Sequence, residues 1–293
     1  MNPFEEPLSE EFEEAVSAVL AERREAQLDE LRAVVEQAND PTARADISGS
    51  TLGGASDDLT ALRLSASGLE PVRPSVPLQS GEHPFVFATF TPPYHGIWPL
   101  LATQPEETRD HAGHLVGYKI VSRMGGYFEF FCAERSIHPA VAELHHQIRV
   151  APQTWLFPPD DVTALAISAR WRISGDTEIS GRGYAALSCD LSLIEVRPYA
   201  ESFEVEFAHE IFVLHSNLEF AAQWSHSLDE WLHLVWDSPR SGLFVIYLTA
   251  SLSAWGADGT ASANFSRLGH LWPHRGRPHI AVPEVRLGWC AGS

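Results

Sequence analysis

From His83 to the C-terminus, apolar and polar residues alternate along one segment after another. Successive side chains of a β-strand point to opposite faces, so such a segment presents one apolar face to a core. Phe203, Val205 and Phe207 alternate with two glutamates in this way. The same pattern predicts strands that share an apolar face at 163–173, 187–193, 244–254 and 285–289, and the run 85–90 reads as a buried strand that ends before Pro92-Pro93.

Turn signals separate several of these segments. Gly125-Gly126 lies between 115–123 and 127–133, a spacing typical of a β-hairpin. Residues 139–148 could form a short helix, because Val141, Leu144 and Ile148 recur at helical spacing, and residues 218–236 fit either a helix or a pair of strands. With eight or more expected strands and few helices, the sequence predicts a mainly β fold, an antiparallel β-sandwich or jelly roll.

Residues 1–40 differ sharply from the rest. They carry twelve acidic and three basic side chains, a net charge of −9, and no Trp, His or Gly, whereas all nine Trp and all fourteen His lie beyond residue 82. Ser9 suits the N-cap of a helix over residues 9–38, and the glutamates that follow suit its first turns. Apolar residues form two stripes on either side of Arg23-Arg24: Phe12, Val16, Val19 and Leu20, and then Leu28, Leu31, Val35 and Ala38.

Residues 41–82 are rich in Ser, Gly, Ala and Pro and poor in aromatic residues, a composition typical of an extended linker. We therefore expect three parts: an acidic amphipathic helical segment at 1–40, a linker at 41–82 and a β-sandwich domain at 83–293. The tether would let the helix reach beyond its own β-domain, and the alternative is that it folds back onto that domain.

Charge and composition exclude several classes. A formal charge of −19 disfavours binding to nucleic-acid phosphates or to an anionic membrane surface. No apolar run approaches the roughly 20 residues that span a bilayer, and the N-terminus lacks the features of a Sec signal peptide. We expect a soluble protein in the cytoplasm, or in a particle assembled there. Cys132, Cys189 and Cys290 are too few and too scattered for a disulfide framework or a zinc knuckle.

Candidate chemistry is sparse. His138, His145 and His146 have no complete metal-ligand pattern around them, and His209 and His215 lie too far apart along a strand to share one metal ion. The acid pairs Asp160-Asp161 and Asp229-Glu230, with nine tryptophans, keep a sugar-binding or glycosidase interpretation open, although Trp171 and Trp289 fall on core-facing positions. No nucleophile motif such as G-x-S-x-G occurs. The His-rich segment 268–279 reads as a surface loop that carries function only in a less favoured interpretation.

The sequence thus favours a non-enzymatic structural or interaction protein that oligomerises or docks into a larger assembly. Its expected partner-binding residues are Phe12, Val16, Val19 and Leu20, because a short helix must bury its apolar stripe to be stable. We expect no catalytic residues, cofactor or metal. The partner would be another protein or a second copy of the chain. The alternative is a carbohydrate-binding β-sandwich, with glycoside hydrolase activity as an extension, and the third hypothesis is a metal-dependent enzyme in a jelly roll.

Overall fold

The structure is a computed structural model, and its described residues lie almost entirely beyond residue 84. They are residues 14, 18, 21, 22, 25, 85–94, 106–122, 125–135, 142–150, 154–156, 162–181, 183–197, 202–207, 211–217, 222–237, 242–256, 259–266 and 279–291. The chain divides into two units, residues 1–73 and 74–293, and all the strands that the structure describes belong to the second. No helix among these described stretches is long and apolar enough to cross a membrane.

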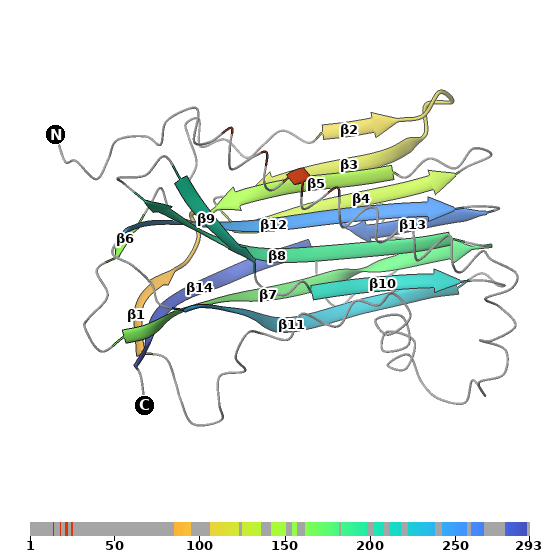
Figure 1. Cartoon of the computed structure of the whole chain (residues 1–293). Coiled ribbons are helices and arrows are strands. Elements are labelled where there is room, and N and C mark those ends of the chain that lie inside the picture. Colours follow the sequence, from red (N-terminus) through yellow and green to blue (C-terminus); the bar gives the residue numbers. More distant parts are fainter. Residues whose placement is uncertain are drawn as a thin grey trace, which may run out of the picture. The chain divides into compact units, whose positions relative to one another are not determined.

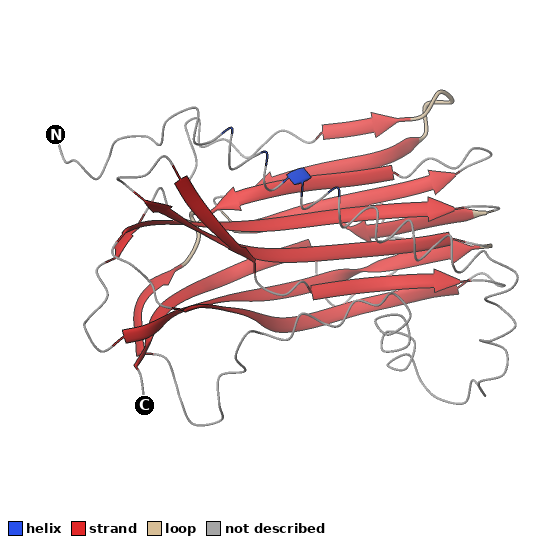
Figure 2. Cartoon of the chain, in the orientation of Figure 1, coloured by secondary structure: helices blue, strands red, loops and turns tan. Residues whose placement is uncertain are grey.

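Nearly every described residue of the second unit lies in a β-strand (Figure 2). The strands are β1 (Phe85–Phe90), β2 (Glu106–Arg109), β3 (Leu115–Ser122), β4 (Tyr127–Arg135), β5 (Ala142–Arg149), β6 (Thr154–Leu156), β7 (Val162–Ser180), β8 (Gly183–Arg197), β9 (Ser202–Phe207), β10 (Ile211–Asn217), β11 (Ala222–Asp237), β12 (Gly242–Gly256), β13 (Thr260–Phe265) and β14 (His279–Ala291). The pairings between them are antiparallel.

The strands form two sheets (Figure 1). In the eight-stranded sheet, which we call sheet A, β7 pairs with β11 on one side and with β14 and β13 on the other. Beyond these lie β1 and β4, then β3 and finally β2. In the six-stranded sheet B, β8 and β12 lie at the centre, flanked by β9 and β10 on one side and by β5 and β6 on the other.

The two sheets pack on one hydrophobic core, which makes the fold β-sandwich-like. Inward-facing residues of sheet A, such as Phe128, Phe130 and Trp171, belong to the same buried cluster as Leu191 and Leu248 of sheet B. The Trp171 and Phe128 rings stack with centroids 6.3 Å apart. Full burial of a large apolar side chain contributes about 1.5–3 kcal/mol, so this shared cluster holds the layers together.

Most of the strand predictions are confirmed. The hairpin at Gly125-Gly126 forms between β3 and β4, and the apolar faces predicted for β7, β8, β12 and β14 are buried, except that Trp289 of β14 is only partly buried. The segment 218–236, expected to form a helix or a pair of strands, forms neither over its described residues: residues 222–237 are one strand, β11.

The short helix predicted at 139–148 is wrong. Residues 142–149 form β5, which pairs with β12 over its whole length. Leu144 and Ile148 lie opposite Leu252 and Leu248. A spacing of four is even, so the two residues share one face of a strand as readily as one face of a helix. Pairing with β12, and not the local spacing of apolar residues, therefore makes this segment a strand.

Candidate functional site

The residues expected to bind a partner, Phe12, Val16, Val19 and Leu20, lie outside the described residues. Five other positions of the predicted helix are described, and Glu14, Ala18, Ala21, Glu22 and Glu25 are all helical and exposed. The partner-binding role of the stripe and the linker at 41–82 therefore stay predictions.

The other sequence candidates are dispersed. His138, Asp160, Asp161 and the loop residues 268–278 lie outside the described residues, and His145 and His146 are neighbours on β5, where adjacent positions face opposite ways. Cys132 and Cys189 are buried in the hydrophobic core. In the part of the chain that the structure describes, no three His, Cys, Asp or Glu side chains gather closely enough to hold a metal ion.

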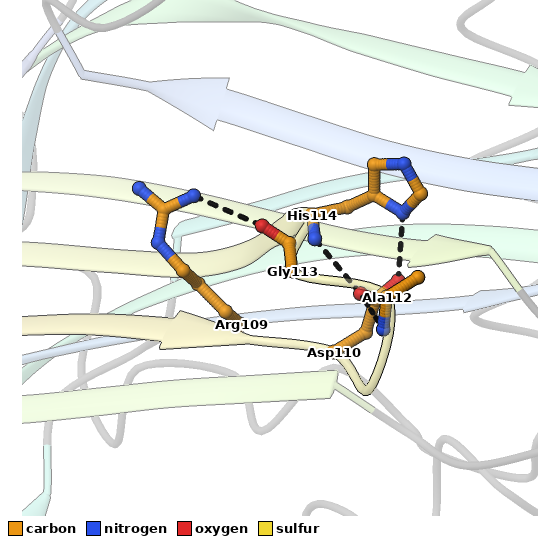
Figure 3. A network of polar contacts seen from close by, with 5 residues as sticks. All are labelled: Arg109, Asp110, Ala112, Gly113 and His114. Carbon is orange, nitrogen blue, oxygen red and sulfur yellow. Dashed lines mark hydrogen bonds and ion pairs between the residues drawn. The ribbon is translucent and has the colours of Figure 1, made fainter.

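A polar network organises the hairpin tip between β2 and β3 (Figure 3). Asp110 Oδ1 accepts hydrogen bonds from the backbone N–H groups of Ala112 and His114, at 2.9 and 2.8 Å, and Oδ2 contacts His114 Nδ1 at 3.1 Å. These bonds hold the pKa of Asp110 below its usual value, with the His114 backbone bond as the largest cause. Gly113 has a φ of 83°, which suits glycine. All of these contacts are local, so the network defines a turn.

A second group of side chains lies on the outer face of sheet A, on β7, β11 and β14. Leu232 and Leu234 of β11 point into the core, so the residues that alternate with them point outward. We call this group the Trp231 surface. It comprises Ser168, Arg170, Arg172, Asp229, Trp231, His233, Glu284 and Arg286.

Charges on the Trp231 surface are paired with one another. Arg170 donates two hydrogen bonds to Asp229, from Nε to Oδ1 and from Nη2 to Oδ2, each 2.7 Å long. Arg172 adds a longer contact of 3.3 Å to Oδ2. On the far side of β7, Arg286 Nε contacts Glu284 Oε1 at 2.5 Å. Paired bonds between a guanidinium and a carboxylate fix orientation as well as charge, so the surface is electrostatically preorganised.

Trp231 is half-buried at the centre of this surface. The guanidinium carbon of Arg286 lies 4.6 Å from the centroid of the indole ring, within the range of a cation–π contact. The ring of His233 stacks beside it at 6.4 Å, with 14° between the ring planes, and His233 Nδ1 contacts Ser168 Oγ at 2.8 Å. Three strands thus hold the indole ring in one position.

The arrangement lowers the capacity of the Asp229 carboxylate for acid catalysis. The Arg170 hydrogen bonds are the largest cause that holds the pKa of Asp229 below its ordinary value. A glycosidase acid needs the opposite shift, so that it carries a proton near neutral pH. Asp229, which the acid-pair hypothesis singled out, is therefore suited to charge pairing.

Six residues of this surface were not predicted from the sequence: Ser168, Arg170, Arg172, His233, Glu284 and Arg286. The available signal was their alternation with core residues, since Arg170 and Arg172 flank Trp171, and Glu284 and Arg286 flank Val285. That signal places them on an outward face but does not say which strands become neighbours.

A different histidine lies on the inner side of β11. His226 Nε2 contacts Thr177 Oγ1 at 2.9 Å, and its ring stacks on that of Phe265 with centroids 5.9 Å apart. Burial lowers the pKa of His226 to about 4, and the charge of Asp176 opposes that shift. The imidazole is therefore neutral in the folded protein near pH 7.

Folding stability should consequently fall as the pH drops from 6.5 to 4. In that window the unfolded chain binds a proton at His226 that the folded chain does not, so acidification favours unfolding, and this contribution levels off below pH 4. Allowing for solvent screening, the loss is about 2 to 3 kcal/mol. Urea unfolding of the wild-type chain and of His226→Gln at several pH values separates the contribution of His226 to stability from that of the carboxylates. A stability difference between the two proteins that does not vary with pH would contradict the assignment.

Comparison with protein families finds none that matches this chain, and comparison with curated proteins finds no significantly similar sequence. The geometry of the described residues is therefore the basis for a functional proposal.

Proposed function

We propose that the chain is a non-enzymatic structural or interaction protein that docks into a larger assembly. In this proposal the second unit is a β-sandwich or jelly-roll head, and residues 1–40 are a helical docking segment on an extended linker. The observation that carries the proposal is the Trp231 surface, where charged groups neutralise one another around a tryptophan held by Arg286.

The composition of that surface supports contact with a macromolecule. Trp and Arg are the residues most often found at the energetic centres of protein interfaces. Asp229 already has its arginine partners, so covering it with another protein would not leave a buried carboxylate unpaired. An extended sheet face can also meet a broad partner surface, in contrast to the concave pockets that bind small molecules.

Sequence features support the helical docking segment. Phe12, Val16, Val19 and Leu20 recur at helical spacing, and each would contribute about 1.5–3 kcal/mol if buried. A helix of this length is marginally stable alone, so burying the stripe against a partner would stabilise it.

The alternative is a carbohydrate-binding β-sandwich, which the parallel rings of Trp231 and His233 favour. Arg286, however, lies over the indole ring, where a sugar would stack. If the surface binds sugar, Arg286→Ala should uncover the ring and raise binding in a glycan screen. If it contacts protein, the same change should leave glycan binding at background and weaken assembly several-fold. Arg172→Ala, which removes an arginine that does not cover the ring, is the matched control.

Light scattering on the full chain at several concentrations tests the proposal. We expect a mass that is a multiple of the 32.4 kDa of one chain. A single-chain mass at every concentration, together with specific glycan binding, would favour the carbohydrate-binding alternative.

A further inference from the structure

Strand β11 forms one edge of sheet A (Figure 1). It pairs with β7 from Ala222 to Asp237 without a register shift. No other strand that the structure describes pairs with its outer side. Its 16 residues would extend about 54 Å at the usual rise of a strand.

This edge lacks most of the devices that usually keep strand edges apart. Protected edges are short or bulged, or carry Pro, Lys or an inward-facing charge, and of these β11 has only Glu230 on its inner face. β11 is long and regular and contains no Pro, Lys or Arg. Its outward carboxylate at Asp229 is neutralised by Arg170 and Arg172 of the neighbouring strand, which leaves Glu230 as the charged side chain at its centre that a register must keep apart from its copy.

We propose that β11 pairs in antiparallel fashion with β11 of a second copy of this chain, about a two-fold axis at Trp231. The inference rests on the proposed function and names its partner. In such a pair, directly opposite residues project to the same face of the sheet. Outward-facing residues of one copy, which have odd numbers, therefore lie opposite outward-facing residues of the other.

The positions of the charged residues favour one pairing register over another. An axis at Glu230 would place two glutamates directly opposite each other, which is destabilising. An axis at Trp231 instead places Asp229 opposite His233 of the second copy, twice by symmetry, and places the two indole rings together. On the inner face it places Leu228 opposite Leu234 of the second copy.

The observed contacts suit this register. His233 Nδ1 contacts Ser168 Oγ, and in the tautomer in which Nδ1 accepts that hydrogen bond, Nε2 carries the proton and can donate to the carboxylate of Asp229 in the second copy. Asp229 Oδ1 accepts the Arg170 Nε bond and has a second lone pair. Cβ atoms of directly opposite residues lie about 4.5–5.5 Å apart, a separation that an imidazole and a carboxylate can bridge.

Disulfide trapping of the full chain tests both the partner and the register. In a Cys290→Ser background, Trp231→Cys should oxidise to a covalent two-chain species, because residues on the axis have Cα atoms within the roughly 4.4–6.8 Å that a disulfide allows. Ser227→Cys lies on the same face of the same strand and is the matched control. It would lie about 27 Å from Ser227 of the second copy and should not cross-link.

A second pair of variants keeps Trp231 intact. His233→Asp would place like charges opposite each other twice and should weaken self-association on the order of tenfold. Ser227→Asp adds the same charge opposite Val235 of the second copy and should weaken it far less.

Cross-linking at residue 227 as strong as at 231, or equal effects of the two Asp variants, would overturn the inference. A wild-type chain that self-associates without cross-linking at 231 would overturn it too, while the proposed function would stand. A chain that is monomeric throughout would overturn the inference, and one that also binds a glycan specifically would contradict the proposed function as well.

Discussion

Gly175→Ala should destabilise the β-sandwich unit by about 3 kcal/mol or more, at the upper end of the usual cost of overpacking. A Cβ at this position of β7 would lie 2.5 Å from the backbone carbonyl oxygen of Asn264, and closer still to the ring of Phe265. That ring is fully buried and also stacks on His226, so it has little room to move. The melting temperature should fall by roughly 6–12 °C, as a thermal melt would measure.

Ser174→Ala, one residue earlier, is the control. Its side chain is only partly buried and lies on the opposite, outward side of the strand, so the change should alter the melting temperature by no more than a degree or two. If Gly175→Ala lowers the melting temperature no more than Ser174→Ala does, the packing of Phe265 against β7 is not as the structure describes.

Much of the fold could be predicted because antiparallel strands leave a strong local signal. Leu165, Ile167 and Trp171 recur at even spacing and are all fully buried in β7. The same rule placed Leu187, Leu191 and Leu248 in the core. These assignments needed no knowledge of which strands are neighbours.

The prediction was wrong where local spacing fits two structures. Leu144 and Ile148 satisfy helical and strand periods alike, and the cross-strand partners in β12 that decide between them lie about a hundred residues away. The segment 218–236 was ambiguous for a similar reason, since the sixteen-residue pairing of β11 with β7 is a tertiary contact.

The candidate site could not be predicted because its pairs are distant in sequence. Arg170 and Asp229 are 59 residues apart, and Ser168 and His233 are 65 apart. Each of these side chains shows only as a polar position on an alternating strand. The order β11–β7–β14 brings them together, and that order is a property of the whole sheet.

A second large loss is expected when charges are placed in the N-terminal apolar stripe of Phe12, Val16, Val19 and Leu20. Val16→Asp with Leu20→Asp should abolish assembly through the helix, because two carboxylates would have to be buried in its apolar contact. The β-sandwich unit should keep its melting temperature, because in the proposed arrangement the stripe contacts a partner and not this unit. The mass should fall to that of one chain, or at most to that of two chains joined at β11.

Ala18→Asp with Ala21→Asp is the matched control, because it adds the same two charges at positions that are exposed. It should leave both mass and melting temperature close to those of the wild-type chain. Assembly lost equally in both double variants would point to net charge, and not to the apolar stripe, as the cause.

The most direct measurement is therefore light scattering coupled to size exclusion, with a thermal melt of each sample, on the wild-type chain and on the two double variants. We expect a multimeric wild type, a multimeric control and a Val16→Asp/Leu20→Asp variant of lower mass with an unchanged melting temperature. A wild type that is monomeric throughout, with a Val16→Asp/Leu20→Asp variant that melts several degrees lower, would show that the helix packs on its own β-domain and does not dock onto a partner.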